Sequence, residues 1–499
     1  MKQKIHHILL ASIAVILAGC VEDTGHYDYV PAAEVTPGTI SGINESYSVL
    51  ALNTLEINPT IAGDEPSDYT WYAYPVPTFH GSPTYTLGNE KALNAMIALP
   101  TGQYRLVLEV KNQKHLTSTY AYSTLHVTRE FSRGWFIAKQ IGDETDIDFI
   151  RLETNTLYPN ILQTINGKRP AGKPLDNAYT STYYCYEVEN PDGTTTLKTD
   201  QPAFFVATDS DLHVYHASEM NLLKEFDNAF FEAPARAPEA LFLAPNGMFV
   251  LNDGKLHGIW NGFYNVGKFG YQVQATNVKL APMTARVGSG FLFFDSRASS
   301  YLYLYTGGTS LDELYPYTHA SSNMNVDLIY LREQEQMGGQ LAAYALVKDR
   351  STGKFRVQKL ASWLVSSMMS PITNEYPVPD ASELTTATVF GLHNCNDALY
   401  YSRGDNKVGY YSITSGQANP GIITFPADER VAYIRHVYND NMDFECLAVL
   451  TNSDNGWKLY CYNFVGYTSD VQLPAFHSFS GEGIARSLLY RDVQITATN

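Results

Sequence analysis

One hairpin pattern recurs along the chain after about residue 130, and it constrains the fold more than any other feature. Each copy is an apolar strand, a polar turn and a second apolar strand. The seven copies are "WFIAKQIGDETDIDFIRLE", "FFVATDSDLHVYHA", "MFVLNDGKLHGIW", "FLFFDSRASSYLYLYTGG", "AAYALVKDRSTGKFRVQKLA", "LYYSRGDNKVGYYSITSG" and "CLAVLTNSDNGWKLYCYNF". They begin at Trp135, Phe204, Met248, Phe291, Ala342, Leu399 and Cys446, so successive starts are 69, 44, 43, 51, 57 and 47 residues apart. Such periods are typical of the four-stranded blades of a β-propeller. The repeat therefore predicts a propeller of seven blades, with six or eight as the alternatives.

Two segments outside the hairpins bear on how this ring is built. The longest gap contains "NGKRPAGKPLDN", which is rich in glycine and proline and is predicted to be an inserted loop. The last apolar segment, "SLLYRDVQITATN", is predicted to pair beside the first blade. Such pairing would close the ring and leave no long free edge.

A different pattern precedes the repeat, from about Ala33 to Glu130. Short alternating strands such as "YTWYAYPV", "GQYRLVLEV" and "YAYSTLHV" are separated by polar turns, and this period of two predicts an antiparallel β-sandwich. Trp71 is expected in its core, and Tyr104 follows a glycine turn as in a tyrosine corner. Both residues are given structural roles. The predicted chain is all-β, with an immunoglobulin-like sandwich over 33–130 and a propeller over 131–499.

The chain opens with "MKQKIHHILLASIAVILAGCVEDTGHY". Its cationic start precedes an apolar run that is too short to span about 30 Å of hydrocarbon, so residues 1–19 are predicted to be a secretory signal. The sequence Leu17-Ala18-Gly19-Cys20 resembles the lipobox of bacterial lipoproteins. This resemblance implies cleavage before Cys20, lipidation of Cys20 and a tether over 20–32, and the alternative is an ordinary signal with an incidental cysteine.

Two acids follow the cysteine directly, Glu22 and Asp23. They resemble the surface-export signal of Bacteroidota lipoproteins, which implies a lipid anchor in the outer leaflet of the outer membrane, at the cell surface. The alternative is a solvated tether that happens to be acidic.

Composition excludes one class of partner. Without residues 1–19 the chain keeps 32 Lys and Arg against 51 Asp and Glu, a formal charge of −19. Such a surface repels phosphate backbones, so no nucleic-acid partner is expected. Charged residues make up 17% of the chain and aromatic residues 13%, including 36 tyrosines, a composition that favours β-sheet.

A lipoprotein with a Gly-x-Tyr sandwich followed by "SRGWFIAKQIGDETDIDFI" resembles the PKD-like (polycystic-kidney-disease-like) family lipoproteins of the Bacteroidota. The resemblance implies a position beside outer-membrane importers of the starch-utilisation type, and hence nutrient capture. The resemblance supplies no catalytic residues.

The sequence lacks the common motifs of hydrolases, zinc peptidases and nucleotide-binding proteins. It contains no His-Glu-x-x-His, Gly-x-Ser-x-Gly or Gly-x-x-x-x-Gly-Lys sequence, so no catalytic residues and no cofactor are predicted. His213 and His216 are three residues apart on a predicted strand and would point to opposite faces. Oxygen ligands for calcium could come from Asp143, Glu144, Asp146 and Asp148 in the first hairpin, but this turn lacks the loop glycine, and a solvated turn is the alternative.

The last hairpin carries two cysteines. Cys446 and Cys461 flank its turn symmetrically, so they are candidates for a disulfide across the hairpin, and buried free thiols are the alternative. The spacing of the cysteines does not match a zinc site.

Two aromatic segments are candidates for ligand binding. The first is "IWNGFYNVGKFGYQ", in which rings that could stack on a carbohydrate or peptide stand next to asparagine and glycine. Its rings are Trp260, Phe263, Tyr264, Phe269 and Tyr271, and the alternative is that they pack between blades. The second is "LYPYTHASSN", with Tyr315, Tyr317 and His319.

Taken together, these features favour a non-enzymatic surface protein that captures a nutrient on its propeller or docks on an import complex. Two alternatives stay open. One is a hydrolase or lyase acting on glycans from the propeller funnel, since that fold also supports catalysis. The other is a structural or adhesive surface protein.

Overall fold

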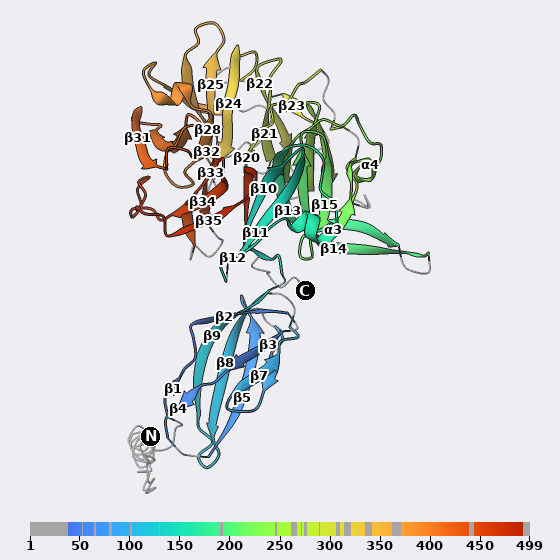
Figure 1. The fold of residues 1–499 in the computed structure, drawn as a ribbon, viewed down its shortest axis with the longest axis vertical. Helices are drawn as coiled ribbons and strands as arrows, with labels where there is room; N and C mark the ends of the chain where they lie inside the picture. The colour runs from blue at the N-terminus through green and yellow to red at the C-terminus, as the bar shows by residue number, and fades with distance from the viewer. Residues whose placement is uncertain are drawn as a thin grey trace, which may run out of the picture. The chain divides into compact units, whose positions relative to one another are not determined.

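A computed structural model confirms the predicted all-β class (Figure 1). It describes residues 38–492 apart from 52, 64–65, 79–81, 100–101, 129, 153, 190–192, 245–246, 261–266, 271, 274–276, 289, 306–309, 314–320, 335–341, 362–370 and 439–443. Cys20 and the acids that follow it lie outside these residues. The chain divides into two compact units between Val127 and Thr128. No helix among the described residues is long and apolar enough to cross a membrane.

The first unit is a small sandwich. A five-stranded sheet has the order β2-β9-β8-β5-β6, and β3-β7 and β1-β4 form two-stranded sheets. The strands are β1 (Ile40–Ser41), β2 (Ser46–Leu50), β3 (Thr54–Ile57), β4 (Thr60–Ile61), β5 (Ser67–Pro75), β6 (Tyr85–Gly88), β7 (Leu93–Met96), β8 (Gly102–Asn112) and β9 (Ser118–Thr128). All described pairings are antiparallel.

The core of the sandwich contains Trp71 and Tyr104, the two residues that were predicted to have structural roles. Trp71 is fully buried on β5, and its Nε1 donates to the carbonyl oxygens of Glu90 (3.2 Å) and Lys91 (3.3 Å). Tyr104 is buried on β8 in the same apolar cluster. Because the tryptophan ring is buried and its N–H is satisfied, burial of its large apolar surface stabilises the fold without a polar penalty.

The described residues of the second unit form seven sheets, which confirms the predicted propeller. Blade 1 holds β10 (Arg133–Ile141), β11 (Glu144–Arg151), β12 (Thr156–Tyr158) and β36 (Ile484–Asp492), and blade 2 holds β13 (Pro174–Glu189), β14 (Thr195–Thr208), β15 (Leu212–His216) and β16 (Leu222–Lys224). Blade 3 holds β17 (Pro238–Ala244), β18 (Gly247–Asn252) and β19 (Lys255–Trp260), and blade 4 holds β20 (Ala285–Val287), β21 (Gly290–Asp295), β22 (Ser300–Tyr305) and β23 (Asp312–Glu313). Blade 5 holds β24 (Val326–Glu333), β25 (Ala343–Asp349), β26 (Phe355–Leu360) and β27 (Ile372–Pro377), and blade 6 holds β28 (Val389–Leu392), β29 (Ala398–Ser402), β30 (Lys407–Ser412) and β31 (Gln417–Thr424). Blade 7 holds β32 (Arg430–Tyr438), β33 (Glu445–Ser453), β34 (Gly456–Tyr462) and β35 (His477–Gly481). Short helices are α3 (Ile161–Asn166), α4 (Phe226–Ala229) and the 3₁₀ helix η1 (Glu383–Thr386).

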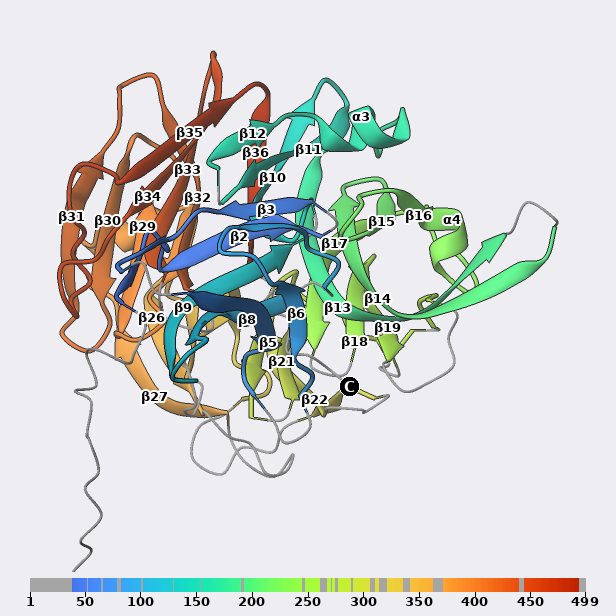
Figure 2. The same cartoon turned by 90° about the horizontal axis from the view of Figure 1, so that it is seen from below.

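The sheets follow one another around a ring in chain order (Figure 2). Each of the seven predicted hairpins supplies two adjacent strands of one sheet. Seven apolar clusters fill the spaces between successive blades, and each cluster draws on two neighbouring sheets. The cluster that contains Trp135 and Trp457 joins blade 7 to blade 1. The ring is therefore closed by packing as well as by pairing.

Closure by the last strand is also confirmed. β36 pairs antiparallel with β10, with Leu488 opposite Ile137. Asn452 of blade 7 adds two hydrogen bonds of 2.8 Å to the backbone of Ala485. The prediction for "NGKRPAGKPLDN" is wrong in part, because Pro174 already begins β13, the innermost strand of blade 2.

The first blade also explains the glycine before Trp135. Gly134 has a φ of 151°, and a Cβ on this residue would lie 2.0 Å from the carbonyl oxygen of Ile150 on β11. Only glycine allows this approach of two paired strands.

Candidate functional site

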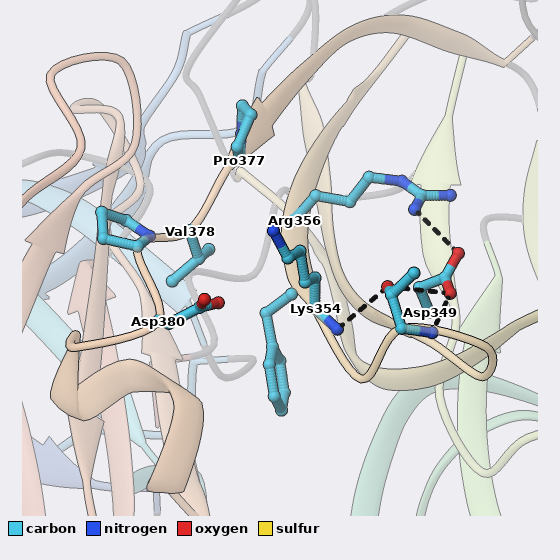
Figure 3. Close-up of a pocket in the computed structure, with 9 residues that line it drawn as sticks. Asp349, Lys354, Arg356, Pro377, Val378 and Asp380 are labelled. Carbon is cyan, nitrogen blue, oxygen red and sulfur yellow. Dashed lines mark hydrogen bonds and ion pairs between the residues drawn. The ribbon is translucent and has the colours of Figure 1, made fainter.

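A pocket on the surface of blade 5 is the candidate ligand-binding site (Figure 3). It lies between the β25–β26 turn and the end of β27. Its volume of about 370 Å³ falls in the range of about 300–1,000 Å³ that small-molecule sites occupy. The lining combines apolar surface from Phe355 and residues 377–379 with the charged residues Asp349, Lys354, Arg356 and Asp380.

Asp349 fixes the shape of the turn on one side of the pocket. Its Oδ1 accepts hydrogen bonds from the backbone nitrogens of Ser351 (2.9 Å) and Thr352 (2.7 Å). Gly353 then adopts a φ of 71°, which glycine reaches without strain. The backbone N–H of Thr352 is the main cause that lowers the pKa of Asp349. The carboxylate is therefore charged at neutral pH and held in place.

Arg356 is held in a similar way. Its Nε donates to Glu375 Oε1 at 2.8 Å, and its Nη1 lies 3.9 Å from Asp349 Oδ2. Glu375 Oε1 also accepts from Gln358 Nε2 at 2.7 Å, and Gln358 accepts a hydrogen bond from the buried Tyr301 of blade 4 at 2.8 Å. This chain of contacts ties the guanidinium to the core, which reduces the side-chain ordering that ligand binding requires.

The pocket floor is aromatic. The ring of Phe355 is half-buried, and Lys348 Nζ lies 5.5 Å from its centroid in a cation–π contact. Lys354 and Asp380 are exposed at the rim. An apolar floor with fixed and exposed charges of both signs can hold a ligand that combines a ring or aliphatic stem with charged or hydroxyl groups.

A second polar group lies on the innermost strands of blades 2, 5 and 7, which carry Asp176, Arg332 and Arg435. Asp176 accepts hydrogen bonds from the backbone nitrogens of Asn177 (2.9 Å) and Leu241 (3.3 Å). Burial raises the pKa of Asp176 to about 6, while these hydrogen bonds and the charges of Arg435 and Arg332 act in the opposite direction. Because blades 2, 5 and 7 are not adjacent, the electrostatic interaction of Asp176 with the two arginines crosses the axis of the ring.

Most of the predicted aromatic site falls outside the described part of the chain. Phe263, Tyr264, Tyr271, Tyr317 and His319 are not described, and neither is the side chain of Trp260. Phe269 is described and fully buried, and its ring lies 6.0 Å from that of Phe205 and 5.3 Å from that of Phe230. The prediction that Phe269 stacks on a ligand is wrong, because its ring packs in the core between blades 2 and 3.

The acidic turn of the first hairpin is also corrected. Asp146 and Asp148 are fully buried rather than solvated. Asp146 Oδ2 accepts from Arg169 Nε at 2.6 Å, and Asp148 Oδ1 lies 2.7 Å from Lys139 Nζ. Of the other two candidate ligands, Asp143 lies in the turn itself and Glu144 begins β11. No cluster able to hold a metal ion is found in the described ranges. The two buried carboxylates serve as ion-pair partners, Asp148 for a lysine of β10 and Asp146 for an arginine of the connection between blades 1 and 2.

The candidate disulfide is absent, since Cys446 and Cys461 are both free and buried. The strand register places Cys461 opposite Ala448, two residues away from Cys446. Symmetric spacing about the turn did not reveal this register. The two thiols remain in hydrogen-bond contact, and burial is the main cause that raises the pKa of Cys446.

The buried histidines serve the fold. On β15, His213 Nε2 lies 3.2 Å from Oδ2 of Asp211, the residue just before the strand. In blades 6 and 7, His436 Nδ1 accepts from the backbone nitrogen of Asn394 at 3.0 Å, and its Nε2 lies 2.8 Å from Glu445 Oε1. The ring of His393 lies 4.4 Å from that of His436. Burial lowers the pKa of His393 to about 3, which makes it a poor general base at neutral pH.

The sequence did not reveal the blade 5 pocket. Its residues stand in the fifth hairpin, where "KDRSTGKFR" fits an ordinary polar turn. The run Asp349-Arg350-Ser351-Thr352-Gly353 was a signal for a fixed turn. The contribution of residues 377–380 could not be seen, because their approach to the turn depends on the pairing of β26 with β27.

Comparison with known proteins gives one family match and several distant structural similarities. The model of the PKD-like family matches residues 20–174, which include the described sandwich and blade 1 strands β10 to β12. No curated protein matches the chain. A quinonprotein alcohol dehydrogenase-like protein from Bacteroides thetaiotaomicron is similar at 14% identity and a TM-score of 0.42, over 91% of this chain and 99% of that one. Apo AztD from Citrobacter koseri is similar at 11% identity and a TM-score of 0.38, over 85% of this chain and 98% of that one. Since both TM-scores lie below 0.5, the architecture rests on the seven sheets themselves.

Proposed function

We propose that this protein is a non-enzymatic binding protein that captures a small charged nutrient in the blade 5 pocket. The observation that carries the proposal is the fixed pair of opposite charges, Asp349 and Arg356, beside the apolar ring of Phe355. Rigid polar groups around an apolar floor favour recognition, because little side-chain entropy is lost on binding. A ligand with both charges, such as a short peptide, fits this lining.

Charge reversal at the rim tests the pocket. Lys354→Glu and Asp380→Lys change exposed side chains, so the melting temperature should stay nearly constant. Each should weaken binding of a ligand found by thermal-shift screening of short peptides and amino sugars. Lys407→Glu and Asp428→Lys, exposed residues of blade 6 and of the segment before blade 7, are the matched controls. Equal affinities for pocket and control variants, measured by calorimetry, would place the ligand elsewhere.

We further propose that Cys20 carries a lipid that anchors the protein at the cell surface, in the outer membrane. The lipobox-like Leu17-Ala18-Gly19-Cys20 and the acids after it support this proposal. Protease treatment of intact cells should remove the protein, and Cys20→Ser should release it from membranes. A membrane-bound protein that resists the protease would face the periplasm instead.

Capture at the surface is useful only if the ligand is passed on. We therefore place the protein beside an outer-membrane importer, as its resemblance to PKD-like lipoproteins implies. Crosslinking in intact cells followed by purification of the full chain should recover an importer. Recovery of the same unrelated proteins with wild type and with Cys20→Ser, and of no importer, would contradict this placement. An adhesive role would then explain the protein better.

A further inference from the structure

Four tyrosines occupy one face of the five-stranded sheet of the sandwich. Tyr72 and Tyr74 alternate on β5 with the buried Trp71, so they lie on the face opposite the core. On β9, Tyr120 and Tyr122 alternate with the core-facing residues of that strand and lie on the same outer face. The ring centroids are 6.5 Å apart in the first pair and 6.4 Å apart in the second, and both pairs are stacked.

The strand register brings the two pairs together over β8. Val107 lies opposite Tyr72 on one side and opposite Tyr122 on the other. Its neighbours Leu106 and Leu108 belong to the core cluster, whereas Val107 points to the outer face. Val107 is nevertheless fully buried, which requires side chains to cover it on that face. The tyrosine pairs flank it, and they form one surface rather than two separate contacts.

A carboxylate fixes one of the rings. Glu109 Oε1 accepts hydrogen bonds from the hydroxyl of Tyr120 at 3.0 Å and from Ser118 Oγ at 2.7 Å. Burial is the main cause that raises the pKa of Tyr72, and Glu109 and the three other tyrosines add to it. The cluster is therefore dense and partly ordered before any ligand arrives, while Tyr120 and Tyr122 remain 44% and 57% exposed.

From this surface, which we call the tyrosine face (Tyr72, Tyr74, Tyr120 and Tyr122), we infer that the sandwich binds a neutral polysaccharide chain. Sugar rings stack on exposed aromatic faces, and their hydroxyl groups hydrogen-bond to carboxylate and phenol oxygens. Arg105 and Lys111 lie on the same face as Glu109 and Asp68. The two charges of each sign balance, so the face has no excess of positive charge that would select a polyanion. The two pairs stand on strands separated by β8, about 9.6 Å apart, which favours a chain over a single sugar.

Area argues against a protein partner as the occupant. At their exposures the four rings offer on the order of 350 Å². A stable protein interface needs about 800 Å² from each partner. A second copy of the sandwich would therefore be held weakly by this face, whereas a linear glycan needs only rings and nearby polar groups.

The test uses the full mature chain and does not depend on the blade 5 pocket. Binding to galactomannan, xyloglucan and amylopectin is measured by affinity electrophoresis, with polygalacturonate as a charged probe. At least one neutral probe should retard the wild-type protein. Tyr120→Ala and Tyr122→Ala should each weaken that binding roughly fivefold, and the double variant should weaken it further.

Tyr467→Ala is the matched control, because Tyr467 is fully exposed on the propeller and, among its described contacts, only its backbone oxygen takes part in a hydrogen bond, which it accepts from Asn396. It should bind as wild type does. Circular dichroism of each variant should match wild type, since the mutated rings lie outside the core. Lys354→Glu should leave polysaccharide binding unchanged, which separates this site from the pocket.

Three outcomes would overturn the inference. They are no retardation by any neutral probe, equal binding by wild type and the double variant, and a preference for polygalacturonate that the double variant keeps. A concentration-dependent dimer in sedimentation that Tyr122→Ala dissociates would instead assign the face to a second copy of the chain.

Discussion

At the scale of single residues, the least predictable feature is the charge buried in the first hairpin. Acidic residues near a turn are usually solvated, so the sequence favoured a solvated or calcium-binding turn. The structure buries Asp148 against Lys139, and Trp457 of blade 7 donates to Asp148 Oδ2 at 3.0 Å. Local sequence could not show this, because Trp457 lies 309 residues away. Trp71, by contrast, was predictable, since its burial follows from strand alternation alone.

Substitution of Lys139 tests how much its ion pair with Asp148 contributes to stability. Lys139→Met leaves the carboxyl of Asp148 buried without its ion-pair partner, and we expect a loss of about 3–5 kcal/mol in the free energy of unfolding of the propeller. Lys139→Met with Asp148→Asn should recover part of that loss. Lys168→Met breaks an exposed pair with Glu225 and should cost less than about 1 kcal/mol. Urea unfolding measures all three, and equal losses for Lys139→Met and Lys168→Met would contradict the prediction.

Asp176 predicts a pH dependence. Its carboxyl has a pKa of about 6 in the folded chain, above the value of about 3.9 in an unfolded chain. The folded state therefore holds this proton more tightly, so its contribution to stability is fully present below about pH 4 and is lost as the pH rises to about 6. The change is on the order of 3 kcal/mol.

Asp176→Asn should remove this component of the pH dependence. Urea unfolding at intervals from pH 4 to 7 should then show the variant gaining on the wild type as the pH rises. Asp349→Asn is the control, because the pKa of Asp349 is lowered, so its contribution to stability is already complete above about pH 4 and this variant should run parallel to the wild type over the same range. Parallel curves for wild type and Asp176→Asn would show that the carboxyl is not buried as described.

At the scale of elements, hairpins were the most predictable part of the chain. In each hairpin a short turn joins the two strands, so the alternation of apolar residues and the turn residues can both be recognised within one local segment. Register was harder. Cys446 and Cys461 are symmetric about their turn in sequence, yet the pairing of Ser453 with Gly456 at the turn displaces them by two residues. The innermost strand of blade 2 was missed because Pro174 and its neighbours resemble a loop.

The closing strand gives an element-scale prediction. A chain that ends at Glu482 lacks β36, which exposes the open edge of β10 and the apolar residues of the blade 7 to blade 1 cluster. We expect the propeller to lose its cooperative unfolding transition and to bind a hydrophobic dye. A chain that ends at Asp492 keeps β36 and should unfold as the full chain does. A cooperative transition in the shorter chain would mean that packing between blades closes the ring without the strand.

At the scale of the whole molecule, the sequence predicted two regions. Both have the alternating pattern of β-strands, but the hairpin repeat begins only after the sandwich. The structure shows why they are separate cores. The sandwich cluster holds Trp71 and Tyr104, and the seven propeller clusters contain only residues from Phe131 onward. The ligand of each region was beyond prediction, because pocket and tyrosine face are assembled from strands whose register is a tertiary property.

Separate cores predict separate unfolding. Calorimetry of the full mature chain should show two transitions, and limited proteolysis should release a stable fragment that begins near residue 128. Trp71→Ala removes a fully buried ring. It should lower the transition temperature of the sandwich alone, because the free energy of unfolding of that unit falls by about 3–5 kcal/mol. Lys139→Met should lower only that of the propeller. A single transition that both substitutions shift equally would show that the two units fold as one, because a shared core makes distant substitutions act on the same equilibrium.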